Sequence, residues 1–316
     1  MTIGVVIRTL NESELIGRCL ETLRGQRGAF ELDIVVVDSG STDSTLEIAR
    51  SYGAGILELQ PGEFDYSRAL NVGIERVAGD FIVSLSAHAI PTTDDWLEKM
   101  AAPFDDPRVA GVASRQVPWP DAPWQEVHRL QHQFGSSLQG YSRETGQEIV
   151  FSNAASSIRR TVWRDVPFTL AAAEDHDWAR RVVTGGWTIV YEPAAVVLHS
   201  HTENARQQAL RMIDIYRAGD RTKSRRTRLR TLRDAVGILM RDARKIALLE
   251  EPIRRKLVYL TELMKMVCFY VIDFSRAGTT AERRREGPIH DAPKNGSALS
   301  SAQNQAQDPV GKQVSP

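Results

Sequence analysis

The stretch IVVVDSGSTDST, residues 34–45, decides the fold of this chain. Its uninterrupted apolar run indicates a strand that is buried on both faces, as in a parallel sheet covered by helices. Asp38 stands where the strand ends, a glycine turn follows, and Ser41 or Thr42 is suited to cap a helix. A carboxylate in this position lies in the crevice that α/β proteins form beyond the carboxyl ends of their strands. Asp38 is therefore a candidate for ligand binding, with helix capping as the alternative.

Strand and helix patterns alternate on both sides of this stretch. Apolar runs and residues at helical spacing predict strands at 3–7, 53–59 and 81–85 and helices at 11–23, 41–52 and 66–77. The same criteria predict a strand or turn at 150–158, a helix at 174–184 and a strand at 188–191, after a loop and helix inserted at 113–148. This order predicts an α/β fold, in which a mostly parallel sheet is flanked by helices.

Composition excludes several classes of protein. Of the 316 residues 42% are hydrophobic, which rules out a wholly disordered or fibrous chain. Forty Lys and Arg balance forty Asp and Glu, so no overall field attracts nucleic acid. The only cysteines, Cys19 and Cys268, provide neither a disulfide framework nor a cysteine metal site, and Cys19 has the spacing of a core residue. The N-terminus has no pattern of a signal peptide, so we expect a cytoplasmic protein.

The chain divides into three parts by pattern. We expect a main domain at 1–204, a helical extension at 205–276 and a disordered tail at 277–316, where large apolar residues are scarce. The extension contains a basic segment, since residues 217–245 include eleven Lys or Arg and three Asp. An amphipathic helix is expected at 257–274, with one apolar side formed by Leu257, Leu260, Leu263, Met264, Val267 and Val271. Its charged residues make it too polar to span a bilayer.

Side chains suited to chemistry follow the other predicted strands. SAH at 86–88 places His88 after a strand, Glu174 and Asp175 begin a helix, and HSH at 199–201 ends another strand. A neutral imidazole can bind a divalent cation, although a loop histidine bound to backbone is the alternative. The acidic pair has the alternative of helix capping, because the helix dipole stabilises negative charge in the first turn.

Taken in order, these segments resemble the family 2 inverting glycosyltransferases of the A-type, nucleotide-diphospho-sugar transferase fold, over roughly residues 2–205. The strings that carry the resemblance are VVIRTLNESELIGRCLETL, VVVDSGSTDST, SRALNVGIERVAGDFIVSLSAHAIPTTDDWL, FSNAASSIRR and AEDHDWARRVVTGGWTIVYEPAAVVLH. FDYSRALNVGI, SAHA and the segment after His199 are most similar to bacterial rhamnosyltransferase branches of surface polysaccharide synthesis.

The resemblance implies a role for each candidate residue. Asp175 would be the general base that activates an acceptor hydroxyl, and His88 with His199 would hold a divalent cation, Mn²⁺ or Mg²⁺. The donor-binding residues implied are Thr9, Glu12, Asp38, Arg68 and Ser86. The acceptor-binding residues implied are Trp119, Trp124 and Glu174, with core packing as the alternative for the two tryptophans. The family's Asp-any-Asp motif reads Ser86-Ala87-His88 here, so one carboxylate is lost and the other is replaced by imidazole.

We therefore expect an enzyme that moves a sugar from a nucleotide-sugar donor to a glycan or lipid-linked acceptor in surface polysaccharide or glycolipid synthesis. One alternative is a nucleotidyltransferase on a similar sheet, but the first loop, RTLNESE, lacks the Gly-rich pattern that this requires. The other is a non-catalytic sugar-binding or scaffold protein, suggested by the lost aspartate. An anionic membrane surface is an expected partner of the basic segment, with an ordinary solvated helical face as the alternative. Nucleic acid is not an expected partner, because that segment lacks aromatic residues.

Overall fold

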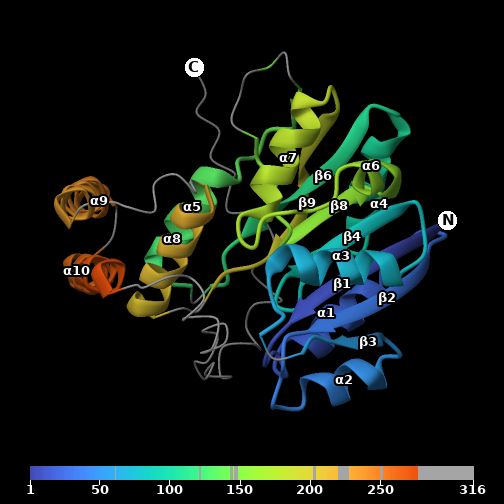
Figure 1. Cartoon of the computed structure of the whole chain (residues 1–316), viewed down its shortest axis with the longest axis horizontal. Coiled ribbons are helices and arrows are strands. Elements are labelled where there is room, and N and C mark those ends of the chain that lie inside the picture. The colour runs from blue at the N-terminus through green and yellow to red at the C-terminus, as the bar shows by residue number, and fades with distance from the viewer. Residues whose placement is uncertain are drawn as a thin grey trace.

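The computed structural model describes residues 1–60, 62–120, 122–142, 145, 149–201, 204–219, 228–249 and 252–276. Within these ranges the chain forms one mixed sheet of nine strands with helices on both faces (Figure 1). The strands are β1 (Thr2–Thr9), β2 (Glu31–Asp38), β3 (Gly55–Glu58), β4 (Phe81–Ser86), β5 (Ile90–Pro91), β6 (Val109–Val117), β7 (Gln139–Tyr141), β8 (Ala155–Arg159) and β9 (Thr188–Leu198). The α/β fold predicted from the sequence is thereby confirmed.

Helices cover the two faces of the sheet in separate groups. The helices of the main domain are α1 (Ile16–Arg24), α2 (Thr45–Ser51), α3 (Tyr66–Arg76), α4 (Trp96–Ala101) with a 3₁₀ turn (Ala102–Asp105), α5 (Trp124–Gln133), α6 (Arg160–Asp165) and α7 (Glu174–Thr184). Helices α1, α2 and α4 share one hydrophobic cluster with the sheet, whereas α3, α5, α6 and α7 share a second on the opposite face. Cys19 is fully buried in the first cluster, as predicted.

The strand directions determine which edge of the sheet carries the candidate residues, and we call it the functional edge. The order is β3-β2-β1-β4-β8-β6-β9-β5, with β7 paired to β9. Strands β1 to β4 are parallel as predicted, whereas β8 is antiparallel to both β4 and β6, and β9 is parallel to β6. Strands β1, β2, β4, β6 and β9 therefore run in the same direction. Their carboxyl ends, which carry most of the candidate residues, meet at a single edge.

Several elements differ from the sequence-based expectations. Strand β6 occupies part of the region expected to be an inserted loop, because its partners β8 and β9 are remote in sequence and leave no local pattern. Helix α2 begins at Thr45 with Ser44 before it, and the expected cap Ser41 binds the Asp38 carboxylate instead. Helix α7 has the predicted bounds.

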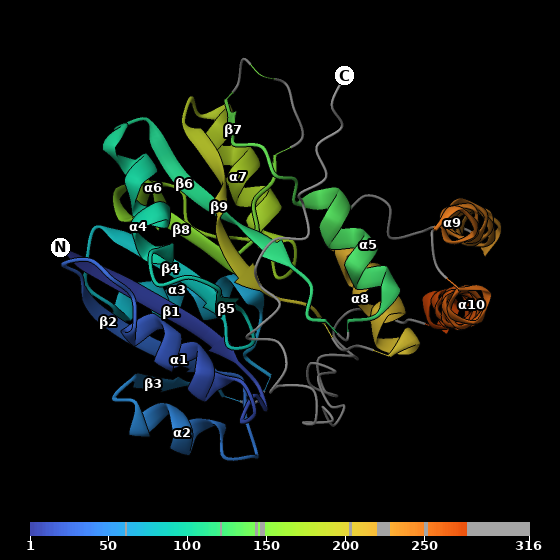
Figure 2. The same cartoon turned by 180° about the vertical axis from the view of Figure 1, so that it is seen from behind.

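Three further helices form the C-terminal part: α8 (Ala205–Gly219), α9 (Arg228–Leu248) and α10 (Ile253–Arg276). They share a third hydrophobic cluster with Trp124 of α5. Helices α9 and α10 lie farther from the sheet than α5 does (Figures 1 and 2). The predicted helix at 257–274 is present, but its single apolar side is wrong. Leu263 and Val267 are buried, whereas Leu257 and Met264 are exposed, so α10 has one apolar face inside the cluster and another outside it.

Two predictions for this part lie wholly or mainly outside the described residues. These are the tail at 277–316 and the centre of the basic segment, residues 220–227. In the part of the chain that the structure describes, none of the helices is long and apolar enough to cross a membrane.

Candidate active site

An acidic pair at the start of α7 forms the centre of the site. Glu174 is buried, and Asn153, which precedes β8, donates from its side chain to Glu174 Oε1 at 3.3 Å. Asp175 is partly exposed, and its carboxylate accepts from the backbone N–H of Asn153 at 3.4 Å and of His176 at 2.8 Å. The pair therefore has one inward and one outward carboxyl group at the functional edge of the sheet.

Burial changes the acidity of the inner carboxyl group, that of Glu174. Desolvation and the neighbouring charge of Asp175 raise the pKa of Glu174 to about 7, against the opposing effect of the Arg8 guanidinium. Glu174 thus retains its proton in mildly acidic solution. Two adjacent carboxyl groups in different environments are a common way to create one neutral acid and one anionic base. Ala173, immediately before the pair, has a φ of 56°, which is strained for a residue with a side chain.

Arg8 links the acidic pair to the sheet, and sequence reasoning missed it. Its Nη1 lies 3.6 Å from Glu174 Oε1, Nη2 donates to the Asn153 carbonyl at 3.3 Å, and the guanidinium lies 5.1 Å from the ring centre of Tyr66. A buried arginine near a carboxylate lowers the cost of ionising it. The feature of the sequence that could have identified Arg8 is a single basic residue within an apolar strand, IGVVIRT.

The loops after β1 and β2 are tied together beside the acidic pair. The backbone N–H groups of Gly40 and Ser41 each donate to Asp38 Oδ2 at 2.9 Å, and Gly40 has a φ of 107° that favours glycine. Ser41 Oγ in turn accepts from the N–H of Asn11 at 2.8 Å. Thr9 lies opposite Asp38 in the strand register. Asp38 therefore shapes a turn at the edge of the crevice, and it does not cap α2.

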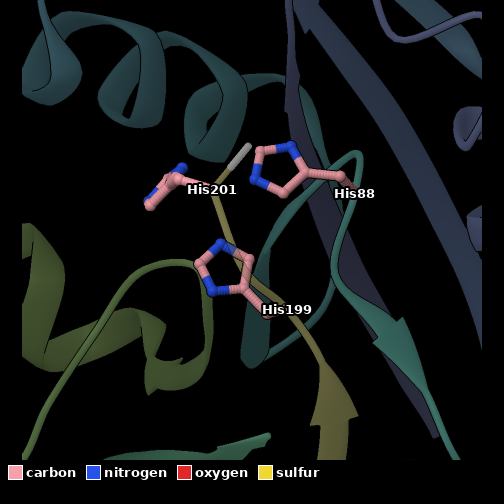
Figure 3. A group of neighbouring side chains, drawn as sticks. All are labelled: His88, His199 and His201. Carbon is pink, nitrogen blue, oxygen red and sulfur yellow. The ribbon is translucent and has the colours of Figure 1, made fainter. Parts of the chain in front are cut away.

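Three histidines gather where β4 and β9 end. His88, His199 and His201 offer nitrogen atoms that all lie within 4.8 Å of one another, and Figure 3 shows the rings turned toward each other. His88 Nδ1 lies 2.7 Å from Glu12 Oε1. The backbone N–H of His199 donates to the Val117 carbonyl at 2.9 Å. The structure therefore brings His88 and His199 together and adds His201, for which the sequence left open whether it is a ligand or a polar edge residue.

These residues fit a divalent cation. His88 Nε2 is buried and has no hydrogen-bond partner in the described ranges, so a lone pair or a proton there is not otherwise used. Leaving a buried polar atom unpaired is costly, and a metal ion would satisfy it. Glu12 on the other ring nitrogen is the arrangement found behind many metal-binding histidines.

The remaining candidates occupy varied positions around the edge. Ser86 lies opposite Arg8 in the strand register, within the sheet edge. Arg68 is on the exposed start of α3 and forms an ion pair with Glu63 at 3.0 Å. Trp119 and Trp124 are both buried, with Trp119 in the first hydrophobic cluster and Trp124 in the third. Packing thus occupies both indole rings in this conformation, and their predicted acceptor role stays a prediction.

Comparison with known proteins decides the family. Residues 4–166 match the family described as Glycosyl transferase family 2. The chain belongs to that family. It is therefore a glycosyltransferase, as the resemblance indicated, and the alternative of a nucleotidyltransferase is removed.

Relatives and solved structures agree with this assignment. The chain is 32% identical over 190 residues to the O-antigen chain rhamnosyltransferase WbaN of Salmonella anatum, covering 57% of this chain and 60% of that protein. It is 28% identical over 224 residues to the O-antigen chain rhamnosyltransferase RfbN of Salmonella typhimurium, covering 68% and 71% of the two chains. Both names agree with the predicted resemblance to rhamnosyltransferase branches.

Two solved structures share the fold. The S. aureus TarS structure, residues 1–349, has a TM-score of 0.52 at 18% identity and covers 90% of this chain and 77% of its own. The mannosyltransferase PcManGT from Pyrobaculum calidifontis, in complex with GDP-Man and Mn²⁺, has a TM-score of 0.50 at 19% identity and covers 89% and 77%. At such identities the likeness concerns the fold alone.

Proposed function

We propose that this glycosyltransferase moves a sugar from a nucleoside diphosphate donor to a hydroxyl of a glycan or lipid-linked acceptor, with inversion of the anomeric centre. The observation that carries the proposal is the Glu174–Asp175 pair, with one buried carboxyl group of raised pKa and one accessible carboxylate at the edge of the sheet. The strained backbone before the pair supports a functional role.

Asp175 acts as the general base in this proposal. Its carboxylate accepts hydrogen bonds from two backbone N–H groups, which orient it. It takes the proton of the acceptor hydroxyl as that oxygen attacks the anomeric carbon, and the bond to the donor diphosphate breaks. A single base on one face of the sugar gives inversion, since retention needs a second displacement. Glu174, held by Asn153 and Arg8, positions Asp175 and borders the acceptor.

The turn formed by Asp38 supports donor binding. Its carboxylate is buried and rigidly held. Thr9 ends the neighbouring strand β1, and Glu12 lies in the loop that follows, which is bonded to the same turn. Together with Ser86 they line the edge where ligands of open α/β sheets bind. Arg68 forms an ion pair with half-buried Glu63, and such a pair at the surface is weak enough to be exchanged for a diphosphate.

The leaving diphosphate requires a balancing positive charge. A divalent cation held by His88 and His199, which we propose as Mn²⁺ or Mg²⁺ from the sequence, supplies that charge when bound. The fold brings the two histidines together, since β5, which follows His88, pairs with the last residues of β9, which precede His199 (Figure 3).

Surface polysaccharide is the acceptor class that we propose. The support comes from two relatives named as O-antigen chain rhamnosyltransferases, which match 57% and 68% of this chain. By the same comparison a rhamnosyl donor is the first to try. Trp119 and Trp124 would need to leave their packed positions to stack on an acceptor sugar.

We further propose peripheral binding to an anionic membrane through α10, which would bring the site to a lipid-linked acceptor. Ile253, Leu257, Met264 and Ile272 are exposed and recur at helical spacing along one side of this helix. Exposed Arg254 and other basic side chains lie among them. Apolar burial and attraction to anionic lipids together bind helices of this type to bilayer surfaces.

A donor screen tests the proposed function. The purified full chain is incubated with labelled nucleotide sugars, including a rhamnosyl donor, with and without Mn²⁺ and with a lipid-linked acceptor. Transfer or slow hydrolysis of one donor is the expected result. Tight binding of a nucleotide sugar without any turnover by the wild-type chain would instead favour the scaffold alternative.

A further inference from the structure

Three imidazoles and no carboxylate form the cluster at the ends of β4 and β9, as far as the described residues show. We infer that this cluster selects a late transition-metal ion, such as Zn²⁺ or Co²⁺, over Mg²⁺, with His201 as the third protein ligand. The inference rests on the proposed function, in which the cation held by this cluster balances the charge of the donor diphosphate. It replaces the Mg²⁺ implied by the family resemblance with a later transition-metal ion. It also assigns His201 as the third ligand, where the sequence left open whether this residue is a ligand or a polar edge residue.

Each histidine is held by a separate anchor. His88 follows β4 and meets the Glu12 carboxylate through Nδ1 at 2.7 Å. A carboxylate partner favours a proton on Nδ1, which leaves the Nε2 lone pair directed away from Glu12. That Nε2 atom is buried and lacks a hydrogen-bond partner in the described ranges. One ligand is thus preset in tautomer and orientation before any ion arrives.

The end of β9 supplies the other two ligands. His199 and His201 are two residues apart, and their backbone N–H groups are fixed by the Val117 carbonyl at 2.9 Å and by Glu126 Oε2 at 3.5 Å. Glu126 is itself buried and paired with Arg129. The ring centres of His199 and His201 are 5.0 Å apart, and each lies within 5.6 Å of the ring centre of His88.

These spacings are close to those of a metal site. Zn–N bonds of about 2.1 Å in a tetrahedron put ligand nitrogens about 3.4 Å apart. The nitrogens here lie within 4.8 Å of one another, so they need to approach by at most about 1.4 Å. The His88 and His199 rings are stacked with an interplanar angle of 11°, so binding also requires a ring rotation that directs both lone pairs at one ion. Three protein ligands leave a fourth position open, which is the usual arrangement when an exogenous oxygen also binds.

The chemistry of the protein ligand atoms decides which metal ion is preferred. Mg²⁺ is a hard ion that demands oxygen ligands in near-octahedral geometry and gives up water reluctantly. Imidazole suits Zn²⁺, Co²⁺ and related ions, whose affinity for nitrogen sites increases along the first transition row. Because His88 stands where the family motif has a carboxylate, the site has lost an oxygen ligand of the kind that Mg²⁺ prefers. The substitution thus changes the selectivity of the site.

Cobalt provides a direct spectroscopic test that requires no sugar donor. The metal-free full chain is titrated with Co²⁺, and the visible absorption of the bound ion is followed. We expect one Co²⁺ per chain with the intense bands of a site of low coordination number, displacement by one equivalent of Zn²⁺, and no displacement by a thousandfold excess of Mg²⁺. Absence of these bands, or displacement by Mg²⁺, overturns the inference.

Variants assign the ligands. His201→Ala should weaken Co²⁺ binding by at least about 100-fold, and Glu12→Gln by about 10- to 100-fold, the usual effect of removing a group behind a ligand. The control is His128→Ala with His132→Ala, which removes a neighbouring histidine pair on α5 that is outside the cluster. This double variant should retain the cobalt spectrum. Loss of the spectrum in the control alone would move the site to α5 and contradict the assignment.

The outcome is independent of sugar transfer. Metal binding is measured in the absence of donor, and the competition between Co²⁺ and Mg²⁺ uses the wild-type chain, so misfolding of a variant does not affect it. A chain with the expected cobalt spectrum and no turnover of any donor refutes the proposed function and leaves this inference standing. A chain that turns over a donor but binds Mg²⁺ better than Zn²⁺ refutes this inference and leaves the proposed function standing.

Discussion

Replacing Glu174 with Gln should remove a pH dependence of stability that the wild-type chain has. Burial and the Asp175 charge raise the pKa of Glu174 from 4.5 to about 7. Below pH 4.5 the group is protonated in the folded and unfolded chain alike. Between pH 4.5 and 7 only the folded chain retains the proton, so stability decreases as the pH rises. Above pH 7 the full cost of a buried carboxylate is present.

The magnitude follows from the size of this pKa change. A rise from 4.5 to about 7 corresponds to about 3 kcal/mol, since one pH unit is equivalent to about 1.4 kcal/mol. Glu174→Gln has no such dependence, because an amide does not titrate. Relative to wild type, the variant should therefore gain about 3 kcal/mol between pH 4.5 and pH 8.

Urea unfolding at several pH values measures the effect. The control is Asp177→Asn on the same helix, where burial raises the pKa but hydrogen bonds from Arg181 and Arg180 outweigh it and lower the pKa. That carboxylate is ionised throughout the range, so its replacement should cost stability by a constant amount from pH 4.5 to 8. A Glu174→Gln variant whose difference from wild type is equally constant would refute the reasoning.

Three further predictions concern the surroundings of the pair. Arg8→Met should raise the pKa of Glu174 further, and the pH midpoint of the stability change should move upward by about one unit in urea unfolding; an unchanged midpoint would mean that Arg8 does not act on this carboxyl group. Asp38→Ala removes the hydrogen-bond acceptor of the Gly40–Ser41 turn and should lower the free energy of unfolding by about 1–3 kcal/mol. It should also weaken nucleotide binding measured by calorimetry, and binding at wild-type strength would exclude Asp38 from the donor site. Leu257→Glu with Met264→Glu should reduce flotation with anionic vesicles at least tenfold, since burying one such side chain contributes about 1.5–3 kcal/mol. Wild-type flotation of this variant would show that α10 does not contact the membrane. The same charge added by Ser51→Glu with Thr184→Glu, on exposed positions of the main domain, should have little effect on flotation.

The sequence predicted those parts of the fold that depend on local pattern. The buried run ending at Asp38 and the acidic start of α7 were recognisable because strand burial and helix periodicity are encoded by neighbouring residues. The antiparallel placement of β8 between β4 and β6 was not, since pairing between remote segments has no local signature. For the same reason the parallel half of the sheet was predicted and the mixed half was not.

The candidate site was predictable to a similar extent. Residues at strand ends, such as His88 and His199, could be grouped because parallel strands end at one edge. Arg8 was missed, because its role depends on Glu174 and Asn153, which reach it from elements about 150 residues away in the chain. The two faces of α10 likewise depend on its packing against α8 and α9, which periodicity alone cannot assign.

The central claim is that Asp175 is the base of a glycosyl transfer, and one comparison tests it most directly. Turnover of the preferred nucleotide sugar is measured for wild type and for Asp175→Asn, with donor binding measured in parallel by calorimetry. The account predicts turnover lower by about 100- to 10,000-fold in the variant, with donor affinity and folding unchanged. Turnover near the wild-type rate in a folded Asp175→Asn chain would contradict it.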